Sequence, residues 1–146
     1  MVFTAPSKFL AAISLVTFSC ASYAQDAIER TWYNHEKTGK VKIFKATDGK
    51  YYGKLVWLKV AEENGKPRVD KNNPDAAHRN DPLMGMQLLK GFTKGDDRHF
   101  SGGTIYDPKN GKTYSCKITR NGNTLDVRGY VGISLIGRTT TWTLAE

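Results

Sequence analysis

Cysteine is scarce in this sequence, and the signatures of common enzymes are missing. Two cysteines among 146 residues are too few for a disulfide-stabilised scaffold or for a zinc site with four thiolates. No Gly-x-Ser-x-Gly motif, no phosphate-binding P-loop and no pair of catalytic carboxylates stands out. No apolar run reaches the roughly 20 residues that a membrane-spanning helix needs. We therefore expect neither a polytopic membrane protein nor a member of the familiar hydrolase or nucleotide-binding classes.

The first 24 residues differ from the rest of the chain. Lys8 precedes an apolar run over residues 9–20, and the small-residue pattern Ala-Ser-Tyr-Ala ends at Ala24. These features are typical of a secretory signal peptide. We expect cleavage after Ala24 and a periplasmic or secreted protein. A buried N-terminal helix and a lipoprotein signal ending at Cys20 are the alternatives, and the bulky Phe18 disfavours the second.

Removal of residues 1–24 leaves 122 residues, a formal charge of +7 and Cys116 as the one cysteine. A single cysteine cannot form an internal disulfide, so stability must come from an apolar core. We expect one domain over residues 25–146, without metal or cofactor. The three histidines, His35, His78 and His99, are isolated from one another in the sequence. We interpret them as surface residues.

The rest of the sequence indicates short antiparallel strands joined by tight turns. Asn, Asp and Gly accept positive φ at low cost, so Asx-Gly pairs are typical of hairpin turns. Four such pairs occur: Asp48-Gly49, Asn64-Gly65, Asn110-Gly111 and Asn121-Gly122. Between them, apolar and polar residues alternate, with Cys116 on an apolar face. The expected strands cover residues 30–36, 40–47, 50–60, 88–93, 98–107, 111–120, 123–131 and 136–144.

This pattern predicts an all-β protein, an antiparallel up-and-down barrel of about eight strands. Neighbouring strands should pair in order, and closure removes exposed strand edges. Residues 61–82 break the pattern, because they are polar and contain three prolines. We expect a long loop there, with a short helix, at one end of the barrel. The apolar run 83–89 is either a helical turn that caps this end or the start of a strand.

Several motifs carry a resemblance that extends from about Trp32 to Trp142. The most specific ones lie in the last third of the chain: Gly102-Gly103-Thr104-Ile105-Tyr106-Asp107-Pro108, Gly111-Lys112-Thr113-Tyr114, and Val127-Arg128-Gly129-Tyr130. The sequence resembles the exported bacterial family catalogued as domain of unknown function 2147. The resemblance implies a small lipocalin-like barrel and no established activity. Some members carry Cys-x-x-Cys in the long loop, where residues 69–73 of this chain contain no cysteine.

Aromatic residues and arginines supply the candidate ligand-binding set: Trp32, Trp57, Tyr106, Arg128, Tyr130, Arg138 and Trp142. The first and last strands of a closed meander are neighbours, so Trp32 and Trp142 would lie at one barrel end. Arg128 or Arg138 would then stack on Trp32. These residues either border a ligand mouth or close the barrel base. An eight-stranded barrel can hold one small ligand or fill with side chains, and the sequence leaves both alternatives open.

These observations favour a binding protein over an enzyme. We expect an exported, non-enzymatic monomer that binds a small, partly apolar molecule in the periplasm or cell envelope. The alternative is an adaptor that contacts anionic wall or membrane polymers through its dispersed lysines. Export would remove the protein from nucleic acid, so we do not expect nucleic acid as a partner. An enzyme is the least favoured hypothesis, because no constellation of residues supports one.

Overall fold

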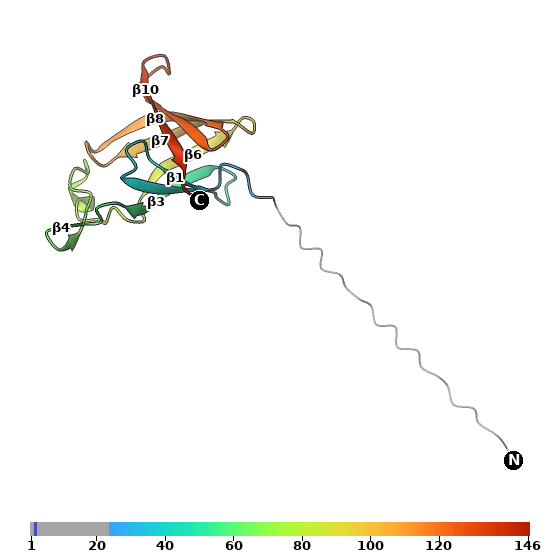
Figure 1. Cartoon of the computed structure of the whole chain (residues 1–146), viewed down its shortest axis with the longest axis horizontal. Helices are drawn as coiled ribbons and strands as arrows, with labels where there is room; N and C mark the ends of the chain where they lie inside the picture. Colours follow the sequence, from blue (N-terminus) through green and yellow to red (C-terminus); the bar gives the residue numbers. More distant parts are fainter. Residues whose placement is uncertain (1, 3–23) are drawn as a thin grey trace.

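The computed structural model describes residue 2 and residues 24–146, and most of the latter form a closed antiparallel barrel (Figure 1). The predicted signal peptide lies almost wholly outside the described residues, so cleavage after Ala24 stays a prediction. No helix in the described part of the chain is long and apolar enough to cross a membrane.

Eight strands build the barrel: β1 (Thr31–Tyr33), β2 (Gly39–Lys45), β3 (Tyr51–Leu58), β6 (Gln87–Lys94), β7 (His99–Asp107), β8 (Lys112–Asn121), β9 (Thr124–Tyr130) and β10 (Gly137–Leu144). They pair in the order β1-β10-β9-β8-β7-β6-β3-β2, and β1 also pairs with β2, which closes the ring. The glycines of all four Asx-Gly pairs have positive φ, between 63° and 79°. The prediction of an eight-stranded up-and-down barrel is confirmed.

The chain between β3 and β6 follows a different course. It contains a small hairpin, β4 (Glu62–Glu63) and β5 (Lys66–Pro67), and the 3-10 helix η1 (Ala76–His78). Leu83 is buried and joins the barrel core, whereas β6 begins at Gln87. The apolar run 83–89 is thus a turn that inserts one leucine, followed by a strand. Figure 1 shows this segment, coloured green, beside the ends of β3 and β6.

The antiparallel connectivity gives the barrel two unlike ends. The N-terminal segment 24–30 and the turns 46–50, 95–98 and 122–123 gather at one end, which we call the base. The turns 34–38, 108–111 and 131–136 gather at the other, the loop end, together with residues 59–86. Asn72 ties this long segment to the loop end, because its side-chain amide donates to the carbonyls of Pro108 and Lys109 at 3.1 and 3.0 Å.

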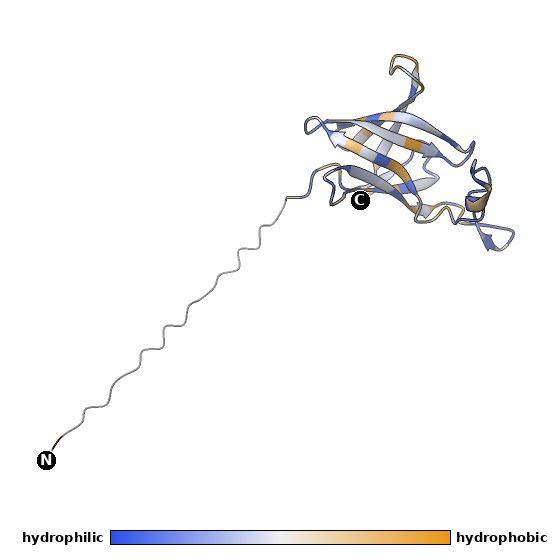
Figure 2. Cartoon of the chain, turned by 180° about the vertical axis from the view of Figure 1, so that it is seen from behind, coloured by the Kyte–Doolittle hydropathy of each residue, from blue (hydrophilic) through white to orange (hydrophobic). Residues whose placement is uncertain are grey.

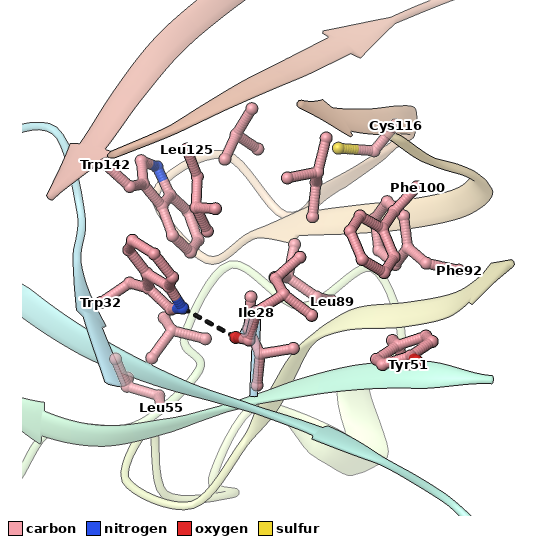
Figure 3. Packing of buried hydrophobic residues seen from close by; sticks show 14 of the residues in the cluster. Ile28, Trp32, Tyr51, Leu55, Leu89, Phe92, Phe100, Cys116, Leu125 and Trp142 are labelled. Carbon is pink, nitrogen blue, oxygen red and sulfur yellow. Dashed lines mark hydrogen bonds between the residues drawn. The ribbon is translucent and has the colours of Figure 1, made fainter. Parts of the chain in front are cut away.

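Large apolar side chains fill the barrel interior (Figure 3). Trp32, Phe92 and Phe100 are each at most 2% exposed. The Trp32 indole N–H donates to the carbonyl of Ile28 at 2.9 Å, and Figure 3 shows Trp142 beside Trp32. The remaining members of the buried cluster are Val41, Ile43, Tyr51, Leu55, Leu83, Leu89, Cys116, Ile118, Leu125 and Val127. Of the two alternatives for the interior, a filled core is the one observed.

Two glycines allow the barrel wall to approach this core closely. A Cβ atom at Gly103 would lie 2.5 Å from the ring of Phe92, and one at Gly53 would lie 2.8 Å from the side chain of Leu89. The register of β7 against β8 also shifts between Phe100 and Gly103, as the Gly102-Gly103 pair predicts for a bend in the wall. The core therefore has no room for even one more methyl group at these positions.

Gly103→Ala should lower the free energy of unfolding by about 1–3 kcal/mol, because the added methyl group overlaps the Phe92 ring. Chemical denaturation measures the change. Ser101→Ala, on an exposed residue of the same strand, should stay within about 0.5 kcal/mol of the wild type. Phe92→Leu in the Gly103→Ala background should cost less than in the wild type. An unchanged stability of Gly103→Ala would show that the interior has spare room.

Candidate functional site

A hollow of about 380 Å³ opens between the long segment and the outside of the barrel. It lies outside because Lys90 of β6 pairs with Thr104 of β7, whereas the adjacent pair Leu89 and Ile105 belongs to the core side. Its volume falls within the range of small-molecule sites. Residues that line the hollow include Asp70, Pro74, His78, Asp81, Met86, Gln87, Lys90, Thr104 and Tyr106.

A buried hydrogen-bond cluster fixes the wall of this hollow. Asp70 is 1% exposed. The Tyr106 hydroxyl lies 2.8 and 2.9 Å from the two carboxylate oxygens of Asp70, and the Asn73 side-chain amide donates to one of them at 2.8 Å. Burial and the bond to Asp70 raise the pKa of Tyr106 to about 12. Tyr106 therefore remains a neutral donor at physiological pH and holds the long segment on β7.

The open part of the hollow carries groups of both charges. The His78 imidazole lies 2.7 Å from the Asp81 carboxylate, and this contact raises the pKa of His78 above its ordinary value. Lys90 is exposed and forms no salt bridge within residues 24–146. Met86 and Pro74 add apolar surface. The arrangement can offer a small molecule hydrogen bonds, a free ammonium group and apolar contact.

A second hollow, of about 240 Å³, lies at the base where residues 24–28 pack on the barrel. Its edge is an ionic cluster rather than an open cleft. The Lys94 ammonium lies 2.6 Å from Asp26 and 3.0 Å from Asp97, and the Tyr51 hydroxyl donates to Asp26. The bonds from Lys94 and then Tyr51 lower the pKa of Asp26. We interpret this cluster as the attachment of the N-terminal segment to the base.

The structure places Trp32 and Trp142 in the core, on the neighbouring strands β1 and β10. The expected stacking of Arg128 or Arg138 on Trp32 is wrong, because the indole is surrounded by core side chains. The Arg128 guanidinium instead donates to the carbonyls of Ser134 and Leu135 on the 131–136 turn, at 2.7 and 3.2 Å. The cation–π contacts found among residues 24–146 all come from lysines.

Of the other predicted residues, Trp57, Tyr106 and Tyr130 lie on the outside of the barrel, whereas Arg138 pairs with Gly129 on the inward face at the loop end. Trp57 is 37% exposed, and its ring meets the Tyr33 ring edge-on. The Lys40 ammonium lies 5.5 Å from the centre of the Trp57 ring and 5.1 Å from the centre of the Tyr33 ring. Tyr130 is half-buried on β9 and Arg138 is exposed on β10. Tyr106 is the member of the predicted set that lines the large hollow. The seven residues therefore do not form one rim, and ligand binding by them stays a prediction.

Sequence reasoning missed Asp70, His78 and Lys90 as parts of one site. The signal that points to them is the polar segment 61–82 with its three prolines, but the sequence does not reveal which strands that segment packs against. Cys116 is fully buried, and burial raises the pKa of its thiol to about 12, as expected for an inward-facing small residue. In the described part of the chain, no group of three or more His, Cys, Asp or Glu side chains is placed to hold a metal ion.

Comparisons with known proteins agree with this architecture. A family model described as "Uncharacterized protein conserved in bacteria (DUF2147)" matches residues 30–144. Among solved structures, protein HP1028 from the human pathogen Helicobacter pylori, which is described as belonging to the lipocalin family, is similar with a TM-score of 0.72. Sequence identity is 26%, over 82% of this chain and 83% of that chain. The search of curated proteins finds no match.

Asp81→Asn should lower the pKa of His78 towards the ordinary value of 6.5, because it removes the carboxylate that raises it. NMR titration of the imidazole protons measures the change, and Asp96→Asn, beside His99, should leave His78 unaffected. Because the pKa of His78 is higher in the folded than in the unfolded protein, the contact between His78 and Asp81 stabilises the fold. This stabilisation is fully present at pH values below the pKa of His78 in the unfolded protein. It is lost as the pH rises through the pKa of His78 in the folded protein. An ordinary pKa for His78 in the wild type would contradict the contact.

Proposed function

The chain belongs to the DUF2147 family of uncharacterized bacterial proteins, and we propose that it acts as an exported, non-enzymatic binding protein. Its ligand is a small, partly apolar molecule that occupies the hollow between residues 69–86 and the outer face of β6, β7 and β8. The single observation that carries this proposal is the preformed hollow of about 380 Å³, built on the buried contact between Asp70 and Tyr106.

The chemistry of the lining supports a ligand with two unlike ends. Met86 and Pro74 offer apolar contact, whereas Lys90, Gln87 and Thr104 offer hydrogen bonds. Ligand sites commonly combine apolar walls with a few fixed polar groups that set orientation. Because Tyr106 and Asp70 satisfy each other, the wall is in place before a ligand arrives, and binding needs little ordering of the protein.

The likeness to a protein of the lipocalin family supports binding of a small molecule rather than catalysis. The proposed ligand site lies outside the barrel rather than in its interior, because core side chains fill the interior of this barrel. A site under the long segment leaves that core intact. The fold thus serves as a rigid support, and the inserted segment supplies the recognition surface.

The N-terminal pattern supports export to the periplasm or the outside of the cell. Ala24 and Gln25 are exposed, and the first buried residue in the range 24–146 is Ile28. Cleavage after Ala24 therefore keeps all the core residues found within 24–146 in the released protein, which we propose to be a monomer. The alternative role, contact with anionic wall or membrane polymers, is supported by the formal charge of +7 that remains after residues 1–24 are removed. High salt would abolish that contact, whereas binding in the hollow would persist.

Native mass spectrometry of the protein isolated from the cell envelope fraction tests the proposed site. We expect a small-molecule adduct on the wild type. Thr104→Trp should remove it, because the indole fills the hollow that Thr104 lines. Ser101→Trp is the matched control, since Ser101 is exposed on the same strand and does not line the hollow. It should retain the adduct.

Melting temperatures of both variants check that the fold is kept. An adduct that survives Thr104→Trp would place the ligand elsewhere on the protein. Loss of the adduct from both variants would contradict a local effect at the hollow, and a wild type that carries no adduct under mild ionisation would contradict the binding role.

A further inference from the structure

The hairpin between β9 and β10 exposes an unusual number of aliphatic side chains. Val131, Ile133, Leu135 and Ile136 are 73%, 58%, 85% and 72% exposed. The hairpin projects from the loop end in Figure 1, and Figure 2 shows hydrophobic colouring at its tip. Contiguous exposed apolar residues on a soluble domain mark interaction sites, because water disfavours them.

Hydrogen bonds give this tip a defined shape. Arg128 reaches from β9 and donates to the carbonyls of Ser134 and Leu135 at 2.7 and 3.2 Å. The amide of Ile136 donates to the carbonyl of Ile133 at 3.2 Å, and Gly132 adopts a φ of 75°. The four aliphatic side chains of this hydrogen-bonded turn are therefore exposed on a loop of fixed backbone shape.

Cationic side chains lie where the hairpin joins strands β9 and β10 at the loop end. The Lys117 ammonium lies 3.4 Å from the Ser134 hydroxyl, Arg128 holds the turn, and Arg138 is exposed at the start of β10. No salt bridge within residues 24–146 engages any of the three. An apolar tip above unpaired positive charge matches the layered chemistry of a membrane surface, where acyl chains lie below anionic headgroups.

We propose that hairpin 131–136 is a membrane-docking loop, which inserts its four aliphatic side chains into an anionic lipid surface while Lys117, Arg128 and Arg138 face the headgroups. A second copy of the chain is a poorer occupant, because the hairpin has six residues, whereas a standard interface uses about 20–30 residues on each side. The proposal is independent of the ligand in the hollow, which lies on β6, β7 and β8.

Co-sedimentation with lipid vesicles tests this proposal. The full-length chain should bind vesicles of phosphatidylcholine and phosphatidylglycerol more strongly than vesicles of phosphatidylcholine alone. Leu135→Asp with Ile136→Asp should weaken binding at least about tenfold, because charged side chains resist transfer into lipid. Val60→Asp with Met84→Asp is the matched control. It places the same two charges on exposed apolar residues away from the hairpin, and binding should change less than about twofold, as a long-range charge effect would predict.

Leu135→Ser with Ile136→Ser serves as an uncharged second variant and should also lose binding, while melting temperatures confirm that each variant is folded. Arg138→Gln should reduce the preference for phosphatidylglycerol. All variants share the same N-terminus, so residues 1–24 cannot account for a difference between them. Equal binding by the tip variants and the control would overturn the proposal. So would equal binding to the two kinds of vesicle, or light scattering that shows a dimer for the wild type and a monomer for the tip variants.

Discussion

Closure of the barrel depends on the burial of Trp32. Its strand, β1, is three residues long, yet it must pair with β10 on one side and β2 on the other. Because β1 is so short, it forms few backbone hydrogen bonds with its two neighbours, and these bonds alone hold it weakly. The indole, 1% exposed and bonded to the carbonyl of Ile28, adds the apolar burial that keeps β1 in place. Without it, β2 and β10 would become open edges, which are prone to pair with other chains.

A filled interior has a consequence for function. Lipocalin-like barrels are associated with small ligands, but here aromatic rings and glycines pressed against them occupy the space inside. The features that we propose for recognition therefore lie on the outside of the strands and at the loop end. The segment 69–86 forms a hollow against β7 through Asp70 and Tyr106, and hairpin 131–136 presents an apolar tip. The rigid barrel fixes both, so each can be altered without disturbing the core.

Local signals made the fold predictable from the sequence. Asx-Gly pairs located the turns, and alternation located the strands, because both depend on residues that are close in the chain. The candidate site is harder to predict from the sequence than the fold. The aromatic ring of Tyr106 makes it a candidate, but its partner Asp70 lies 36 residues away, and only the folded chain brings the two together. The predicted contact of Arg128 with Trp32 fails because the sequence does not give the strand pairing. In the sheet, Arg128 of β9 pairs with Lys117 on one side and Thr139 on the other, and its side chain therefore faces outward.

Side chains pack the interior of the barrel, and the proposed ligand site therefore lies outside it. Crystals of the protein pressurised with xenon test this claim most directly, because xenon enters dry apolar cavities large enough to hold it. We expect no xenon in the region bounded by Trp32, Phe92 and Leu125. A xenon atom located there would reveal an interior cavity and show that the core is not fully packed.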